Sequence, residues 1–174
     1  MRIISGNHKG RRIVAPKNLP VRPTTDRSKE SLFNILENRY YFHGKSSLDI
    51  FSGTGNISYE FSSRGIKDVT SVDSNFNCIN FIRNNSEKLD LNINTIHSDA
   101  ISFLKKCTRK FNFIFADPPY SYQKHSEIVK IIRDRKLVEQ NGCLIIEHDE
   151  TTYFTDNNIE QKKYGTVNFS IFSF

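Results

Sequence analysis

From Ser47 onward, short apolar runs alternate with stretches in which apolar residues recur at helical spacing. The apolar runs predict five strands, at 47–51, 69–72, 92–96, 111–116 and 142–147. The stretches between them predict four helices: one that reaches Gly65, one at about 75–89, one with Ile101 and Leu104, and one marked by Ile128 to Ile132. Strands that alternate with helices in this way predict a mostly parallel, doubly wound α/β sheet.

The last part of the chain shows a different pattern, which predicts two antiparallel strands. We expect them at 159–163 and 166–174, joined by a turn at Lys163-Tyr164-Gly165. In the second strand, Val167, Phe169 and Ile171 alternate with Asn168, Ser170 and Phe172, as in a half-exposed strand. A parallel core closed by such a hairpin favours a Rossmann-like class I methyltransferase sheet of seven strands over a dinucleotide-binding domain.

The first 39 residues carry the whole net charge of the chain. They hold nine Lys and Arg residues against three Asp and Glu, which equals the net charge of +6 for all 174 residues. Residues 2–6 and 11–15 predict a β-hairpin with a basic tip. Thr25 and Asp26 can begin a helix at about 27–38, in which Leu32, Ile35 and Leu36 share one face. We expect residues 1–24 to be a basic extension and residues 25–174 to form the main domain. A basic segment on a neutral body is typical of a protein that binds nucleic acid.

Composition narrows the classes of protein further. The hydrophobic fraction of 37% and the charged fraction of 25% are typical of a globular domain. The three cysteines are far apart and form no metal-binding or redox pattern, as expected for reduced thiols in a cytoplasmic protein. We expect no metal site, no signal peptide and no membrane partner.

The run Phe111 to Ala116 ends in Asp117-Pro118-Pro119-Tyr120. The prolines stop the strand because they fix φ and donate no N–H. Asp117 should therefore lie at the carboxyl edge of the sheet, where open α/β sheets bind ligands. Asp117 and the Pro118 carbonyl could accept the two N–H bonds of an exocyclic amine, while Tyr120 could stack on its ring.

Three further acids occur at or near strand ends, and together with Asp117 they predict a ligand site. Asp49 precedes the loop Ser52-Gly53-Thr54-Gly55, whose glycines allow a close backbone approach to a ligand. Asp73 ends the next strand, 18 residues after Gly55, and suits ribose hydroxyls. This spacing also fits NAD. Asp99, with Ala100 beside it, is placed to accept an adenine amino group.

Four segments carry a resemblance to a known family. They are Arg2 to Arg12, the run Arg22-Pro-Thr-Thr-Asp-Arg27-Ser-Lys-Glu-Ser-Leu-Phe-Asn, and Phe51-Ser-Gly-Thr-Gly together with Asp-Pro-Pro-Tyr. The chain resembles the bacterial RsmD family of 16S ribosomal RNA guanine-N2 methyltransferases over essentially its whole length. The resemblance implies S-adenosylmethionine as cofactor, ribosomal RNA in an assembling 30S subunit as partner, and a monomer. Ser58, where the family often has glycine, and the short acid Asp73 are departures.

The resemblance also implies roles for particular residues. The implied catalytic residues are Asp117, Pro118, Pro119 and Tyr120. The implied cofactor-binding residues are Asp49, Phe51, Gly53, Gly55, Asp73, Asp99, Ala100 and Asp117. We expect RNA contacts from Arg2, His8, Lys9, Arg11, Arg12, Arg22 and Arg27.

Three other functions remain open at this point. A DNA adenine-N6 methyltransferase shares the Asp-Pro-Pro-Tyr motif but usually has a separate target-recognition domain. A protein glutamine methyltransferase usually has asparagine at the position of Asp117. A non-catalytic RNA-binding module would not require four acids at strand ends.

Overall fold

The computed structural model describes residues 1–16, 19, 25–119, 121–155 and 159–174. It contains a seven-stranded sheet in the order β3-β2-β1-β4-β5-β7-β6. The first five strands, β1 to β5, pair in parallel, and β7 runs antiparallel to both β5 and β6. The strands are β1 (Ser46–Ile50), β2 (Asp68–Asp73), β3 (Ile93–His97), β4 (Phe111–Ala116), β5 (Val138–His148), β6 (Ile159–Tyr164) and β7 (Val167–Ser173). The predicted doubly wound sheet with an antiparallel end is confirmed.

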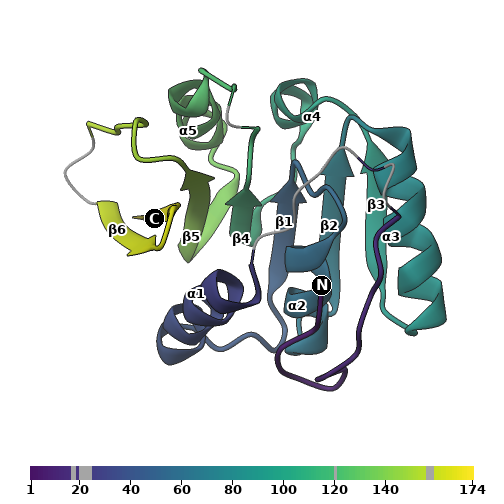
Figure 1. Cartoon of the computed structure of the whole chain (residues 1–174). Helices are drawn as coiled ribbons and strands as arrows, with labels where there is room; N and C mark the ends of the chain where they lie inside the picture. The colour runs from purple at the N-terminus through teal and green to yellow at the C-terminus, as the bar shows by residue number, and fades with distance from the viewer. Residues whose placement is uncertain (17–18, 20–24, 120, 156–158) are drawn as a thin grey trace.

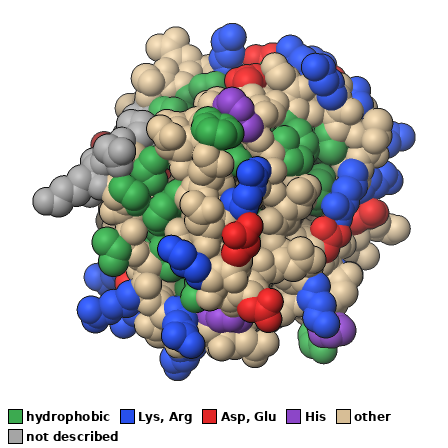
Figure 2. Space-filling view, turned by 90° about the vertical axis from the view of Figure 1, so that its right-hand side faces the viewer, with side chains coloured by type: hydrophobic (Ala, Val, Ile, Leu, Met, Phe, Trp, Pro, Cys, Tyr) green, Lys and Arg blue, Asp and Glu red, His purple; other side chains and the backbone are tan. Residues whose placement is uncertain are grey.

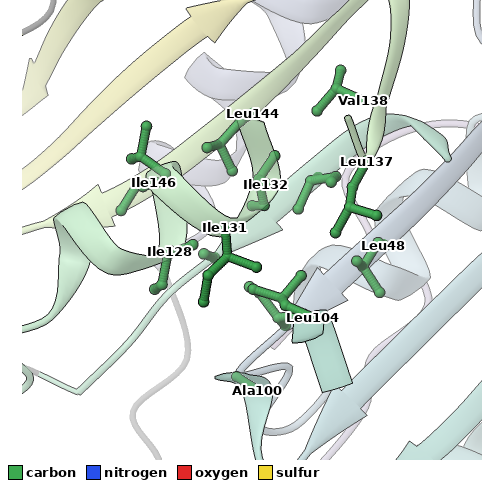
Figure 3. Packing of buried hydrophobic residues seen from close by; sticks show 14 of the residues in the cluster. Leu48, Ala100, Leu104, Ile128, Ile131, Ile132, Leu137, Val138, Leu144 and Ile146 are labelled. Atoms are coloured by element: carbon green, nitrogen blue, oxygen red, sulfur yellow. The ribbon is translucent and has the colours of Figure 1, made fainter. Parts of the chain in front are cut away.

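Helices cover both faces of the sheet (Figure 1). They are α1 (Asp26–Arg39), α2 (Asn56–Ser63), α3 (Phe76–Lys88), α4 (Ala100–Lys106) and α5 (His125–Asp134). Apolar residues of α1 and α2 form one core cluster with Phe113, Phe115 and Phe169. On the other face, α4 and α5 pack Leu104, Ile128 and Ile132 against strand residues such as Leu48, Leu144 and Ile146 (Figure 3).

Side-chain caps explain where several helices begin. The Thr25 hydroxyl accepts a hydrogen bond from the Ser28 backbone N–H at the start of α1. Asn75 and Asp99 cap α3 and α4 in the same manner, so both helices begin directly after the loops that follow β2 and β3. At the end of α2, Gly65 adopts a φ of +106°, as expected for a residue just past a helix. The caps of α3 and α4 thus fix the loops that follow β2 and β3 at the carboxyl edge of the sheet.

Two predicted features of the strands are wrong. The alternation in 166–174 predicts a half-exposed strand, but Ser170 and Phe172 are buried along with their neighbours. The reason is that β7 lies between β5 and β6, and its polar side chain is satisfied by a hydrogen bond between Ser170 Oγ and His148 Nε2 at 2.8 Å. In addition, β5 begins at Val138 rather than near Gly142, with a register shift against β4.

The N-terminal hairpin is present, although regular strands do not form in it. One antiparallel bridge joins Arg2 and Arg12, and the backbone N–H of Ile3 donates to the Arg11 carbonyl at 3.0 Å. Ile3 and Ile13 are buried against Tyr59 of α2 and neighbouring residues. The hairpin therefore shares a core with the body of the protein.

Charged side chains of both signs share the molecular surface. On the face that Figure 2 shows, Lys and Arg side chains lie at the top, right and lower left, with acidic side chains among them. Within the described ranges, no helix is both long enough and apolar enough to cross a membrane.

Candidate active site at the carboxyl edge of the sheet

Asp117 directly follows β4 at the centre of the carboxyl edge. The pairing of Ala116 with Ile50 of β1 and with Ile146 of β5 brings Asp117 between the ends of these two strands. Glu147, the next residue of β5, is buried. Pro118 is buried and Pro119 is exposed. Tyr120 lies outside the described residues, so its predicted stacking role stays a prediction.

The environment of Asp117 raises the pKa of its carboxyl group well above the ordinary value. Burial is the main cause, and the negative charges of Glu147 and Asp49 add to it. A carboxylate with a raised pKa is a stronger proton acceptor. The sequence pattern did not single out Glu147, although it is an acid at a strand end like the other four.

The glycine loop and Asp73 form one unit. The backbone N–H of Gly53 donates to Asp73 Oδ2 at 2.8 Å, and the N–H of Asn75 donates to Oδ1 at 2.8 Å. Each carboxylate oxygen can accept a further hydrogen bond, so Asp73 still fits a pair of ribose hydroxyls. Gly55 has a φ of +78°, and a Cβ at this position would lie 2.9 Å from Ile82. The loop thus requires glycine for its conformation and for its packing.

Asp49 lies beneath this loop and is 1% exposed. Its Oδ2 accepts hydrogen bonds from the Ser58 backbone N–H at 3.1 Å and from the Ser58 hydroxyl at 2.6 Å. Burial raises the pKa of Asp49 to about 7, although the bonds from Ser58 oppose this shift. Ser58, the departure from the family pattern, therefore occupies one oxygen of Asp49 and leaves the other for a ligand.

The remaining predicted cofactor contacts lie around the same edge. Asp99 is exposed, and its Oδ1 accepts the Ser102 N–H at 2.8 Å, while Ala100 is buried as the first residue of α4. Phe51 adopts a φ of +61° directly after β1, and its ring meets that of Tyr122 edge-on with centroids 5.3 Å apart. Tyr122, which no sequence motif indicated, has a buried hydroxyl without a hydrogen-bond partner in the described chain.

The charges at this edge suit a cationic ligand. No Lys or Arg among the described residues forms an ion pair with Asp49, Asp73 or Asp117. Nor do these described ranges contain a group of three or more His, Cys, Asp and Glu side chains that could hold a metal ion. S-adenosylmethionine carries a sulfonium and an ammonium group, and it would bring the positive charge that buried Asp49 lacks. The residues present therefore fit this cofactor.

The predicted RNA-binding residues lie on the hairpin and on the first turn of α1. Lys9, Arg11, Arg12 and Arg27 are exposed, and in the described structure none of them forms an ion pair. Arg2 is half-exposed and lies 3.5 Å from Asp26. His8 is half-buried, and Arg22 lies outside the described residues.

The tip of the hairpin lies at the far end of α2 from the glycine loop. The backbone N–H groups of Asn7 and His8 donate to the carbonyl and hydroxyl of Ser63, the last residue of α2, at 2.8 and 3.0 Å. In Figure 1 this tip lies near the bottom of the view, whereas the arrowheads of β1, β2 and β4 point upward. Because α2 has eight residues, the two ends are about 12 Å apart.

The chain is similar in sequence to proteins that are already known. The family described as Conserved hypothetical protein 95 matches residues 1–173. YlbH of Bacillus subtilis, which is named provisionally as an rRNA methyltransferase, is 36% identical over 86% of this chain and 83% of its own. Ribosomal RNA small subunit methyltransferase D of Haemophilus influenzae is 27% identical, with 99% and 93% covered.

A solved structure has the same fold as this chain. The Escherichia coli protein yhhF superposes with a TM-score of 0.86 at 26% sequence identity. The similarity covers 99% of this chain and 97% of that one, so it includes the hairpin as well as the sheet.

Proposed function

Because the chain belongs to the family described as Conserved hypothetical protein 95, the RsmD family, we propose that it methylates the exocyclic N2 of a guanine in 16S ribosomal RNA. Membership makes it an S-adenosylmethionine-dependent methyltransferase that acts on RNA. The proposal adds the base, the atom and the residues that serve them. The observation that carries it is the position of Asp117, which lies between β1 and β5 and is followed by two prolines.

Each acid at the carboxyl edge has a distinct role in binding. When bound, S-adenosylmethionine supplies an electrophilic methyl group. Asp49 would hold the cofactor's ammonium group, Asp73 the ribose hydroxyls, and Asp99 with Ala100 the adenine edge. Gly53 and Gly55 let the backbone approach, and Phe51 lines the site.

Asp117 would act on the target amine. Its carboxylate and the Pro118 carbonyl accept the two N–H bonds of the amino group, which orients the nitrogen lone pair toward the methyl group. Asp117 then takes the proton that the amine loses on methylation, a role favoured by its raised pKa. Pro119 stiffens the loop. Tyr120 would stack on a guanine that has left its base stack.

The hairpin would supply affinity for RNA through phosphate contacts. Arg2 and Arg12 are directly opposite each other in the antiparallel bridge, an arrangement that places like charges side by side at a cost in stability. A polyanion would relieve this repulsion. Together with Lys9, Arg11 and Arg27, they form the proposed RNA-contacting part, which consists of residues 1–24 and the start of α1. We also propose an assembling 30S subunit as the partner. We further propose that the protein acts as a monomer in the cytoplasm.

Replacement of the proposed proton acceptor tests the mechanism. Asp117→Ala should reduce single-turnover methylation of 16S rRNA by at least 100-fold, because both orientation and proton transfer are lost. Affinities for S-adenosylmethionine and RNA should change little. Asp134→Ala, at an exposed acid on α5, is the control and should keep full activity. An Asp117→Ala protein that methylates at the wild-type rate would refute the role of Asp117.

The identity of the target is tested by mass mapping. 16S rRNA from cells that lack the protein should have lost one N2-methylguanine. The purified protein should restore that modification with 30S particles or 16S rRNA. A DNA adenine-N6 methyltransferase is the competing assignment, and methylation of duplex DNA at adenine with no change in the rRNA would establish it instead.

A further inference from the structure

A buried ionic network joins the basic hairpin to the glycine loop at 52–55, which we call the cofactor loop because it is proposed to bind the cofactor. The proposed mechanism does not use this network. Its centre is the pair of Lys29 on α1 and Glu60 on α2, with Nζ and Oε2 3.0 Å apart and both side chains 0% exposed. Lys29 is part of the N-terminal segment that carries the family resemblance, and Glu60 follows 31 residues later.

Lys29 binds the hairpin and the start of α2 at the same time. Its ammonium group donates to the Arg2 carbonyl of the hairpin at 2.7 Å and to Asn56 Oδ1 at 2.7 Å. With Glu60, this gives three acceptors for its three N–H donors. Asn56 is the first residue of α2 and directly follows Gly55 of the cofactor loop. Lys29 therefore connects a segment proposed to bind RNA with a segment proposed to bind the cofactor.

Glu60 holds the same hairpin from the other side. Its Oε2 accepts the Ile4 backbone N–H at 2.9 Å, and its Oε1 accepts the Ser5 N–H at 3.0 Å and Arg64 Nε at 2.8 Å. A second link runs nearby, where the Thr54 hydroxyl of the cofactor loop lies 3.6 Å from Met1 Sδ. The hairpin backbone, α1 and the first turn of α2 thus share one set of contacts.

The location of this network is costly if stability is its only purpose. Removal of two charges from water costs several kcal/mol per ion, and apolar side chains of similar size often stabilise a protein as well or better. Burial lowers the pKa of Lys29, and the attraction of Glu60 opposes that shift. The apolar contacts of Ile3 and Ile13 already attach the hairpin to the body. The ionic network adds a directional connection that ends at Asn56.

We propose that Lys29 and Glu60 are positioning residues that make RNA binding at the hairpin and cofactor binding at the Gly53–Gly55 loop cooperative. The element with two states is the hairpin, which is either docked on α2 through this network or displaced from it. RNA bound to Arg2, Arg11 and Arg12 favours the docked state, and the docked state holds Asn56 and the loop in the cofactor-binding arrangement. By linkage, each ligand raises the affinity for the other by the same factor. The inference rests on the proposed RNA substrate.

The test measures the affinity for S-adenosylhomocysteine, which permits no turnover, with and without saturating 16S rRNA. In the wild type, RNA should raise this affinity at least fivefold, the lower end of usual allosteric coupling. In Lys29→Met the ratio should fall to about one, because the link to Arg2 and Asn56 is lost. Arg39→Met is the matched control on the same helix. It removes an exposed cation that pairs with Glu160, and it should keep the wild-type ratio.

A second variant guards against a loss of folding in Lys29→Met. Asn56→Ala leaves the Lys29–Glu60 pair and the hairpin contacts in place but removes the bond from Lys29 to the start of α2. In this variant too, the ratio of cofactor affinities with and without RNA should fall to about one. Its affinity for RNA alone should stay at the wild-type value. A purely structural network would lower the melting temperature without a change in the ratio, and such a result overturns the inference. If the wild type fails to bind RNA at all, the proposed function fails instead.

Discussion

Asp49 combines a functional position with an ionisation that opposes folding. Its raised folded-state pKa means that the folded protein holds the proton more tightly than the unfolded chain does. Below about pH 4 the group is protonated in both states and makes no difference to stability. As the pH rises toward 7, the unfolded chain releases the proton freely while the folded protein does not, so stability is lost in this window.

Asp49→Asn should therefore flatten the dependence of stability on pH. The amide oxygen can still accept a hydrogen bond from Ser58, and no ionisation remains at this site. Relative to the variant, the wild type should lose on the order of a few kcal/mol in free energy of unfolding between about pH 4 and 7. Urea unfolding of both proteins across this range measures the difference, in which the contributions of other groups cancel. Parallel curves for the two proteins would show that Asp49 titrates normally.

At the scale of elements, the attachment of the hairpin depends on one glycine. Gly6 has a φ of +83°, and a Cβ there would lie 1.9 Å from the Ser63 backbone carbonyl oxygen. Gly10 has the same φ of +83°, but nothing lies within 4 Å of its would-be Cβ. The two positions therefore differ in packing while the cost of their backbone conformation is the same.

Gly6→Ala and Gly10→Ala form a matched pair. The Gly10 variant should lose about 1–2 kcal/mol in free energy of unfolding, the cost of a left-handed conformation for alanine. The Gly6 variant should lose about 1–3 kcal/mol more, because the hairpin must move away from α2 and the bonds of Asn7 and His8 to Ser63 weaken. Urea unfolding gives both values, and equal losses would mean that the hairpin adjusts without cost.

The elements themselves were largely predictable, because periodicity and caps are local properties of the chain. The start of α1 at Thr25, the end of α2 before Gly65 and the end of β4 before the two prolines each depend on a few neighbouring residues. The partners of β7 were not predictable in this way. The alternation of Phe169 and Ile171 with Ser170 and Phe172 predicts a half-exposed strand. Only the position of β7 between two other strands explains why Ser170 is buried.

The site was predictable to the same extent. Asp49, Asp73 and Asp117 come to one edge because parallel strands end on the same side of a sheet. The bond from Gly53 to Asp73, the proximity of Glu147 to Asp117 and the Lys29–Glu60 pair depend on side chains that are far apart in sequence. No local pattern signals such contacts.

At the scale of the whole molecule, the two proposed binding regions differ in charge. Acids gather at the carboxyl edge, while exposed cations lie along the hairpin. Under the proposed function, an RNA that approaches the acidic edge would be repelled there, and the hairpin, which reaches to the other end of α2, would supply the attraction. The RNA would then be held at a distance from the site and present only the target base to it.

Charge reversal of Arg11 and Arg12 to Glu tests this arrangement. Affinity for 16S rRNA should fall, and the log–log slope of affinity against salt should decrease by about 0.7–0.9 for each phosphate that the variant no longer neutralises. Affinity for the cofactor, measured without RNA, should not change. The same reversal at Lys105 and Lys106 of α4, on the opposite face of the sheet, serves as the control in filter binding. An equal fall in affinity for the control would indicate non-specific attraction by net charge.

The strand order has a consequence for the way in which the molecule is made. β6 precedes β7 in the chain, yet in the described sheet its neighbour is β7 and not β5. During synthesis, the parallel strands β1 to β5 can therefore pair with one another before β7, the neighbour of β6 in the described sheet, has been made. The edge of β5 stays open until residues 167–173 emerge, and it is exposed to other nascent chains during that interval. We expect the antiparallel end of the sheet to be completed late, after both of its strands have been made.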